Sequence, residues 1–253
     1  MDQQQPIPAA TVVILRDRAG APPELLMLER ARAMAFAGGA LVFPGGRLDP
    51  ADHALAALHA GDGMDADDVA ARIAAVRETL EEAGVAVGLS ATPGRAAMAA
   101  IRAALAEGAA LAELLAAHGV TLALDGLVPF ARWCPQHSLA RIFDTRFYLA
   151  RAPEDAEAIV DATENVRLFW ASAQSVLDDA DAGRVTIIYP TRRNLERLAR
   201  YGSFDEAVAD ARAFPIRTIT PVQEERDGVR YLSIPDDLGY PITSEPMTGA
   251  MRG

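Results

Sequence analysis

The sequence predicts a mixed α/β sandwich, built as one domain with added helices. Three observations favour this fold class. Apolar runs typical of strands lie on both sides of an acidic stretch that has the pattern of a helix. The connections between these segments are short, so that the strands can pack beside the helix. Hydrophobic residues make up 51% of the 253 positions, which is enough apolar surface for a buried core.

The first part of the chain contains three predicted strands. Apolar runs at 11–15 and 24–29 are joined by a turn around residues 20–23. The third run, 40–43, leads into Pro44-Gly45-Gly46, where the chain must turn sharply. We expect the acidic stretch 49–68 to be an irregular loop whose aspartates cap the helix that follows.

A helix is predicted over residues 67–83. Its apolar side chains recur at i, i+4, i+7 and i+11, as one buried face of a helix requires; they are Val69, Ile73, Val76 and Leu80. Gly84 follows directly and provides the C-terminal cap.

The second part alternates helices and strands. Residues 95–117 predict two helices separated by Gly108, and the strands that follow are expected at 127–133, 143–150 and 166–170. Further helices are predicted at 173–182 and, as a pair, within 191–213. The tail predicts a hairpin formed by 216–221 and 229–234 around Asp227-Gly228.

The amino-acid composition limits the kinds of molecule that this protein is expected to bind. The formal net charge of −11 provides no basic field for nucleic acid, so that a small molecule is the expected partner. All 24 basic residues are arginine, whose guanidinium binds phosphate oxygens bidentately. Charged residues interrupt the alanine-rich stretch 95–124, so no membrane span is expected. The single cysteine, Cys134, favours a reducing compartment, and we expect a soluble cytoplasmic protein.

The most informative segment is Arg77 to Val85. Glu78, Glu81 and Glu82 lie at i, i+3 and i+4 on the predicted helix and therefore share one face. Like charges at these spacings repel one another, and only Arg77 accompanies them. One interpretation is a solvated helix face. The other is a site for a hard divalent cation, Mg²⁺ or Mn²⁺, at a catalytic centre.

These residues also match a known pattern. Gly46, then Asp52 six positions on, then Arg77–Val85 resemble the Nudix box, G-x5-E-x7-R-E-U-x-E-E-x-G-U. The second half is matched at every charged position and at the glycine. Asp52 replaces the first glutamate of the pattern, and the spacer after it is longer, which implies an insertion at about residues 53–68.

The resemblance implies a Nudix-type α/β/α sandwich with a mixed sheet and additional helices. It implies one domain over residues 1–253, with a core of about 10–240 and an added helical region at about 95–118. The implied chemistry is hydrolysis of a diphosphate bond with Mg²⁺ or Mn²⁺ held by Glu78, Glu81 and Glu82.

Further residues receive roles from the same resemblance. Arg77 would orient the glutamates, and Gly45 and Gly46 would let the backbone approach the helix, the metal and the substrate closely. Glu164 is the candidate for a fourth acidic group, with an exposed loop carboxylate as its alternative. Arg146 is a candidate for contact with a substrate phosphate, with an ion pair to an acidic neighbour as its alternative.

The substrate is inferred from the branch of the family. Residues 43–52 with the expanded box, and residues 143–147, resemble the branch that contains the peroxisomal Nudix coenzyme A diphosphatase. Arg30 and Gly39 match its coenzyme A motif, whereas Ala31 and Ala35 replace a serine and a second arginine. The branch implies cleavage of coenzyme A or acyl-CoA to 3′,5′-ADP and a 4′-phosphopantetheine, with Arg30 binding substrate.

Two alternatives to this substrate and this activity are open. One is a pyrophosphatase for ADP-ribose, NADH or a nucleotide sugar. Another is a non-catalytic nucleotide-binding or regulatory protein with the same fold. Because many family members dimerise, a homodimer is also open.

Overall fold

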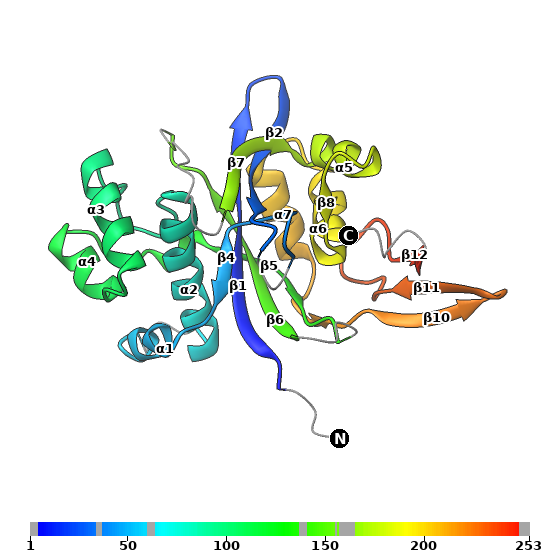
Figure 1. The fold of residues 1–253 in the computed structure, drawn as a ribbon, viewed down its shortest axis with the longest axis horizontal. Helices are drawn as coiled ribbons and strands as arrows, with labels where there is room; N and C mark the ends of the chain where they lie inside the picture. The colour runs from blue at the N-terminus through cyan, green and yellow to red at the C-terminus, as the bar shows by residue number, and fades with distance from the viewer. Residues whose placement is uncertain are drawn as a thin grey trace.

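A computed structural model describes residues 5–33, 37–59, 64–136, 141–154, 156 and 165–247. Strand β1 (Ile7–Arg18) runs through its centre (Figure 1). It pairs in parallel with β6 (Phe143–Arg151) on one side. On its other side it pairs antiparallel with β2 (Ala21–Arg30) and with the short β4 (Gly45–Arg47). The chain therefore folds around β1.

The main sheet is mixed. Its strand order is β8-β3-β2-β1-β6-β5-β9, with β4 attached to β1 and β7 attached to β2. The strands not yet given bounds are β3 (Ala40–Val42), β5 (Val128–Trp133), β7 (Asn165–Ser172), β8 (Thr186–Ile187) and β9 (Thr218–Ile219). A smaller antiparallel sheet consists of β10 (Val222–Arg226), β11 (Val229–Ser233) and β12 (Ser244–Pro246).

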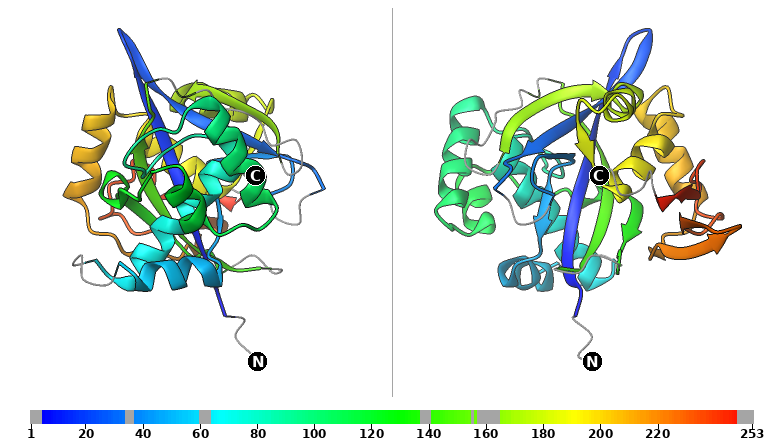
Figure 2. Two further views of the ribbon diagram at one scale, coloured as in Figure 1. Left: turned by 90° about the vertical axis from the view of Figure 1, so that its left-hand side faces the viewer. Right: turned by 45° about the vertical axis from the view of Figure 1, so that its right-hand side comes forward.

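Helices cover both faces of the main sheet (Figures 1 and 2). One layer contains α1 (Pro50–Ala57), α2 (Ala66–Ala83), α3 (Arg95–Ala106) and α4 (Leu111–Ala117). The opposite layer contains α5 (Ala173–Asp181), α6 (Tyr189–Leu198) and α7 (Phe204–Ala213). A short 3₁₀ helix, η1 (Leu124–Gly126), precedes β5.

Strand β1 connects the two cores because its side chains alternate between the faces. Val12 and Ile14 belong to the core under α2, whereas Val13 and Leu15 belong to the core under α5, α6 and α7. A strand buried on both faces has a continuous apolar run rather than an alternating one, and β1 has that run. The predicted α/β/α sandwich is confirmed.

Most of the predicted elements are present, with shifted ends. Two predictions are wrong. The stretch 49–68 is not wholly irregular, because α1 occupies Pro50–Ala57. Pro50 stands at the first helical position, where its missing N–H costs nothing, and the Asp52 carboxylate accepts the Asp49 N–H at 2.8 Å. The part of the expected insertion at 60–63 lies outside the described residues.

The second correction concerns the hairpin. Asp227 and Gly228 form its turn as expected, with φ of 52° and 76°. A two-residue turn with both φ positive requires the strands to follow it directly, and Arg226 pairs with Val229. The first strand is therefore Val222–Arg226 and not 216–221. Within the expected segment, Thr218–Ile219 instead pairs in parallel with β5 in the main sheet.

Helix α2 is anchored firmly at its first turns. The Asp65 carboxylate accepts the N–H groups of Asp67 and Asp68, as the predicted cap requires. Asp68 also accepts the Tyr148 hydroxyl of β6 at 2.7 Å and the Arg72 Nε at 2.7 Å. At the other end Gly84 has φ 63° and ends the helix as predicted. This anchoring fixes the direction in which α2 presents its last two turns.

No helix in the described ranges is both long enough and apolar enough to cross a membrane. The predicted helical addition at about 95–118 is present as α3 and α4. The assignment of residues 1–253 to one domain with a core of about 10–240 stays a prediction.

We expect Ile14→Ala to lower the free energy of unfolding by about 2–5 kcal/mol, because the side chain is 0% exposed and truncation leaves a cavity. Denaturant unfolding measures this change. Ile216→Ala is the matched control: Ile216 is 43% exposed, and its truncation should change the free energy by no more than about 0.5 kcal/mol. Equal losses for both variants would contradict the assignment of β1 to the core.

Candidate active site

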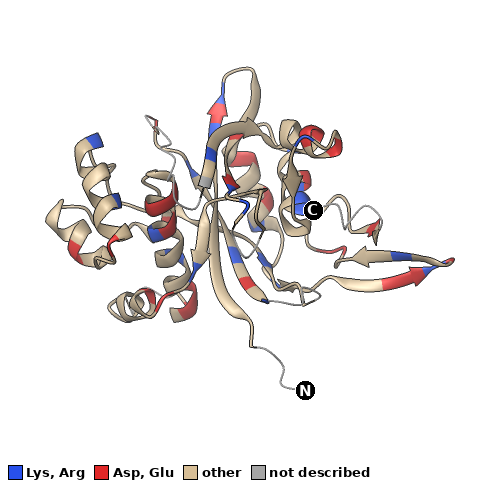
Figure 3. Cartoon of the chain, in the orientation of Figure 1, with Lys and Arg blue, Asp and Glu red and all other residues tan. Residues whose placement is uncertain are grey.

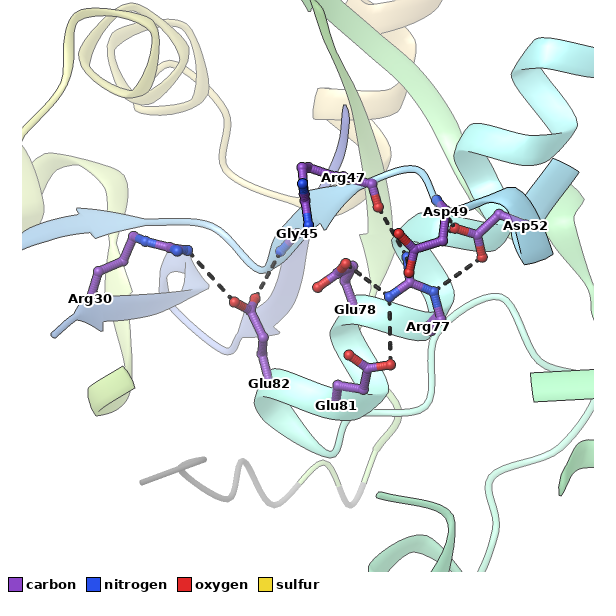
Figure 4. A network of polar contacts seen from close by, with 9 residues as sticks. All are labelled: Arg30, Gly45, Arg47, Asp49, Asp52, Arg77, Glu78, Glu81 and Glu82. Atoms are coloured by element: carbon purple, nitrogen blue, oxygen red, sulfur yellow. Dashed lines mark hydrogen bonds and ion pairs between the residues drawn. The ribbon is translucent and has the colours of Figure 1, made fainter. Parts of the chain in front are cut away.

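Three glutamates occupy the last two turns of α2, next to the loop that leads into β4 (Figure 4). Glu78 and Glu82 are largely buried, with side chains 17% and 7% exposed, and Glu81 is 27% exposed. Strand β4 lies here because it pairs with β1, on which α2 packs. The sheet thus brings a glycine-rich segment against the acidic end of the helix.

The two glycines at the start of β4 make this contact possible. The Gly45 N–H donates to Glu82 Oε2 at 3.0 Å. A Cβ on Gly46 would lie 2.3 Å from the carboxyl carbon of Glu78. Gly45 has φ 154°, and a Cβ there would lie 2.3 Å from the Ala10 carbonyl oxygen. A side chain on Gly46 would therefore clash with the Glu78 carboxylate, and one on Gly45 would clash with β1. The expected close approach of the backbone to the helix is therefore observed.

Arg77 connects the glutamates to helix α1. It donates to both carboxylate oxygens of Asp52, from Nε at 3.1 Å and from Nη2 at 2.9 Å. Its Nη1 donates to Glu78 Oε1 at 2.9 Å and to Glu81 Oε1 at 3.5 Å. Its Nη2 also donates to the Arg47 carbonyl at 3.0 Å. One guanidinium thus holds two of the three carboxylates and is itself held by the buried Asp52.

The carboxylates carry more negative charge than their surroundings neutralise. Burial raises the pKa of Glu78 to about 8; Arg77 opposes this shift, and the charges of Glu82 and Glu81 add to it. Burial also raises the pKa of Glu81, again against Arg77. For Arg77, burial lowers the pKa, but the hydrogen bond to Asp52 and the nearby carboxylates raise it above its ordinary value overall. An additional cation would stabilise the ionised glutamates.

Two further arginines reach this end of α2 from other elements. Arg30 of β2 places Nη1 3.7 Å from Glu82 Oε1, and its buried Nε has no hydrogen-bond partner among the described residues. Arg102 of α3 donates to the Glu81 carbonyl from Nε at 3.2 Å and from Nη2 at 3.0 Å. Sequence reasoning assigned no role to Arg102, and a side chain bonded to a backbone carbonyl leaves no pattern in the sequence.

The structure brings together most of the predicted site residues, namely Arg30, Gly45, Gly46, Arg77, Glu78, Glu81 and Glu82 (Figure 4). It does not bring Arg146 to them. Arg146 donates to the Asp67 carbonyl in the first turn of α2, about 16 Å along the helix from Glu78. Its partner is a backbone carbonyl and not the acidic side chain of the alternative interpretation. Glu164 lies outside the described residues.

The residues fit a divalent cation by chemistry. Carboxylate oxygens are the donors that Mg²⁺ and Mn²⁺ prefer, and burial, the main cause of the raised pKa of Glu78, favours pairing of that carboxylate with a further cation. In the described part of the chain, no three His, Cys, Asp or Glu side chains are arranged so that they could hold a metal ion together. The fit therefore rests on the type of donor atom, and Arg77 and the Gly45 N–H occupy part of the hydrogen-bonding capacity of the glutamates.

Comparison with known proteins gives two informative matches. A search of protein-family models finds no match to this chain. The chain is 28% identical over 184 residues to the Caenorhabditis elegans protein named “Putative nudix hydrolase 7”. That match covers 72% of this chain but 57% of the relative, so this chain spans little more than half of its length. A NUDIX hydrolase from Alicyclobacillus acidocaldarius is 29% identical in its crystal structure, with a TM-score of 0.72 over 82% of this chain and 97% of that one.

The NUDIX domain of a Shewanella oneidensis protein in complex with ADP-ribose is more distant, at 12% identity and a TM-score of 0.44 over 78% of this chain and 88% of that one. It carries no argument about the substrate.

In its fold, this chain is similar to a NUDIX hydrolase. The similarity of sequence and of structure supports the Nudix hydrolase family for this chain, and these relatives indicate a hydrolase.

We expect Gly46→Ala to weaken Mn²⁺ binding by about 10–100-fold, because the new Cβ would displace the Glu78 carboxylate that it contacts at 2.3 Å. Titration calorimetry of the purified protein measures this change. Gly126→Ala is the control, since nothing lies within 4 Å of a Cβ there. Unchanged Mn²⁺ affinity in a folded Gly46→Ala protein would separate Gly46 from the metal site.

Proposed function

We propose that this protein is a divalent-metal-dependent hydrolase that cleaves the diphosphate bond of a nucleoside-diphosphate-linked compound. The observation that carries the proposal is the convergence of Glu78, Glu81 and Glu82 beside the Gly45-Gly46 loop. The 29% identity and TM-score of 0.72 with a NUDIX hydrolase structure support it.

Hydrolysis requires a water oxygen to bond to phosphorus while the bridging P–O bond breaks and its electron pair leaves with the phosphate. Such a reaction depends on positioning and on charge neutralisation. A bound Mg²⁺ or Mn²⁺ would neutralise phosphate oxygens and lower the pKa of a coordinated water.

The residues of the chain would hold and orient that cation. Glu82 and Glu78 are the proposed principal ligands, and Glu81 shares in binding. Glu82 is oriented by the Gly45 N–H at 3.0 Å, and Glu78 by Arg77 at 2.9 Å. These contacts orient the two carboxylates before a metal binds.

The position of Arg30 is evidence for a negatively charged substrate. Over the described chain, acidic and basic residues are interspersed, and acidic ones are prominent on α2, α5 and β10 (Figure 3). A polyphosphate approaching this acidic surface needs local positive charge. Arg30 lies 3.7 Å from Glu82 and has a buried Nε without a hydrogen-bond partner among the described residues, so it can donate to a phosphate oxygen.

Coenzyme A or an acyl-CoA is our proposed substrate, cleaved to 3′,5′-ADP and a 4′-phosphopantetheine. The resemblance of residues 43–52 and 143–147 to the coenzyme A diphosphatase branch, together with Arg30, supports this choice. The segments flank β1 from opposite sides, as β4 and β6. ADP-ribose, NADH or a nucleotide sugar is the alternative. A non-catalytic nucleotide-binding protein is a further alternative, which the presence of all three box glutamates argues against.

The cellular compartment and the oligomeric state of this protein are also proposals. The free, buried Cys134 supports a reducing compartment, and we propose the cytoplasm. A homodimer follows from the family resemblance, and size-exclusion chromatography with light scattering tests it.

We expect Glu82→Gln to lower kcat by about 100-fold or more, because it removes a charge that acts on the metal during the reaction. Phosphate-product release under saturating substrate and Mg²⁺ measures the change. Glu113→Gln on α4 is the matched control and should retain activity. A Glu82→Gln protein with normal kcat would remove Glu82 from the metal centre.

A substrate panel tests the proposed specificity. We expect kcat/KM to be higher for coenzyme A than for ADP-ribose or NADH, and turnover to stop when a chelator removes the metal. Mass spectrometry of the products identifies which bond breaks. Faster cleavage of ADP-ribose would overturn the coenzyme A choice. No turnover of any member with Mg²⁺ or Mn²⁺ would favour the non-catalytic alternative.

A further inference from the structure

Helix α3 lies outside the acidic helix, yet one of its side chains reaches the backbone that carries the glutamates. Arg102 donates to the carbonyl of Glu81 from both Nε and Nη2, at 3.2 and 3.0 Å. The same Nη2 lies 3.5 Å from the Glu82 carbonyl. We propose that Arg102 is a positioning residue for the metal-binding carboxylates of Glu81 and Glu82; the inference rests on the function proposed above.

The first reason is electrostatic. A helix has partial negative charge at its C-terminal end, where cations stabilise it and anions do not. Helix α2 has no basic residue in its last turn, although Glu81 and Glu82 lie close to that end. The guanidinium of Arg102 provides the missing positive charge from a neighbouring helix. It provides this charge through hydrogen bonds to the backbone carbonyl of Glu81.

The second reason is hydrogen bonding. The last carbonyls of a helix have no partner within the helix. Leu80 O accepts the Gly84 N–H at 3.1 Å, and the next two carbonyls, of Glu81 and Glu82, are those that Arg102 approaches. A helix end without such partners frays, and fraying here would move two metal-binding residues.

Gly84 gives Arg102 access to this position. Gly84 has φ 63°, and a Cβ on it would lie 3.0 Å from the Cδ of Arg102. The glycine that ends α2 therefore also leaves space for the side chain that holds the end. This is a second constraint on the residue, in addition to its backbone conformation.

Helix α3 holds Arg102 in place through its apolar face. Met98, Ile101 and Leu105 are buried in the core that α2 shares. Arg102 follows Ile101, which is fully buried, so its backbone has little freedom to move. The helical addition thus contributes to the site by fixing one side of the last turn of α2, while Arg77 contacts the Glu81 and Glu78 carboxylates directly.

The test compares variants of the full chain. Arg102→Gln removes the charge and most of the hydrogen bonding, Arg102→Lys keeps the charge with a different geometry, and Arg95→Gln changes an exposed arginine on the same helix. We expect the Mn²⁺ dissociation constant of Arg102→Gln to rise by about 10–100-fold, with a smaller rise for Arg102→Lys and no change for Arg95→Gln. Titration calorimetry below the unfolding temperature measures these constants.

Two further measurements separate positioning from general destabilisation. In the metal-free protein, amide hydrogen exchange in the segment 78–86 should accelerate in Arg102→Gln, while exchange in β1 stays slow. Under saturating Mn²⁺, activity should recover substantially, because the loss is in metal affinity. Unchanged Mn²⁺ affinity in folded Arg102→Gln, or equal losses in Arg95→Gln, would overturn the inference. If the wild-type protein is active, failure of saturating Mn²⁺ to restore the activity of Arg102→Gln would also overturn the inference.

The same data separate this inference from the proposed function. Wild-type protein that binds Mn²⁺ but hydrolyses no diphosphate would end the proposed activity, and the Mn²⁺ affinities of the variants would still decide the role of Arg102. Wild-type protein that binds no Mn²⁺ would overturn both.

Discussion

The crowding of three carboxylates at one end of α2 is the constraint on which the rest of the site depends. Neighbouring like charges on a helix repel, and burial raises the free energy of ionised Glu78 and Glu81 further. Arginines from other elements lie against this end of α2: Arg30 comes from β2 and Arg102 from α3. Arg77, on α2 itself, is fixed by Asp52 of α1. Arginine side chains from three elements, and one aspartate of α1, therefore surround the acidic end of α2.

The main sheet supports the helix end and the glycine loop that lie beside the carboxylates. Strand β1 is buried on both faces, so it supports α2 on one side and the α5–α7 layer on the other. It also pairs with β4, which places Gly45 and Gly46 against the helix end. A rigid strand thus sets the distance between a loop and a helix far apart in sequence. Such a support suits a site whose chemistry requires accurate placement.

The sequence predicted what is encoded locally. The apolar stripe of α2 and its cap at Gly84 follow from spacing and residue type, and so does the shared face of the three glutamates. Contacts between distant residues were not predictable in this way. Arg77 meets Asp52 across 25 positions, and Arg102 meets the Glu81 carbonyl across 21. Helix α1 was missed because its aspartates suggested a loop, whereas Asp52 supports the helix start and binds Arg77.

The acidic helix and the arginines around it have separate consequences for the reaction. Under the proposed function, the three carboxylates would hold the metal at the bond that is cleaved, and other residues would distinguish one diphosphate from another. Arg146 is bonded to the Asp67 carbonyl at the other end of α2, away from the three glutamates. Arg30 is different, because it is loosely paired with Glu82 and its Nε is unsatisfied within the described chain. A metal bound by Glu82 would weaken that pair and leave the guanidinium to the substrate. Under the proposed function, selection among substrates would therefore depend on β2 and its neighbours more than on α2.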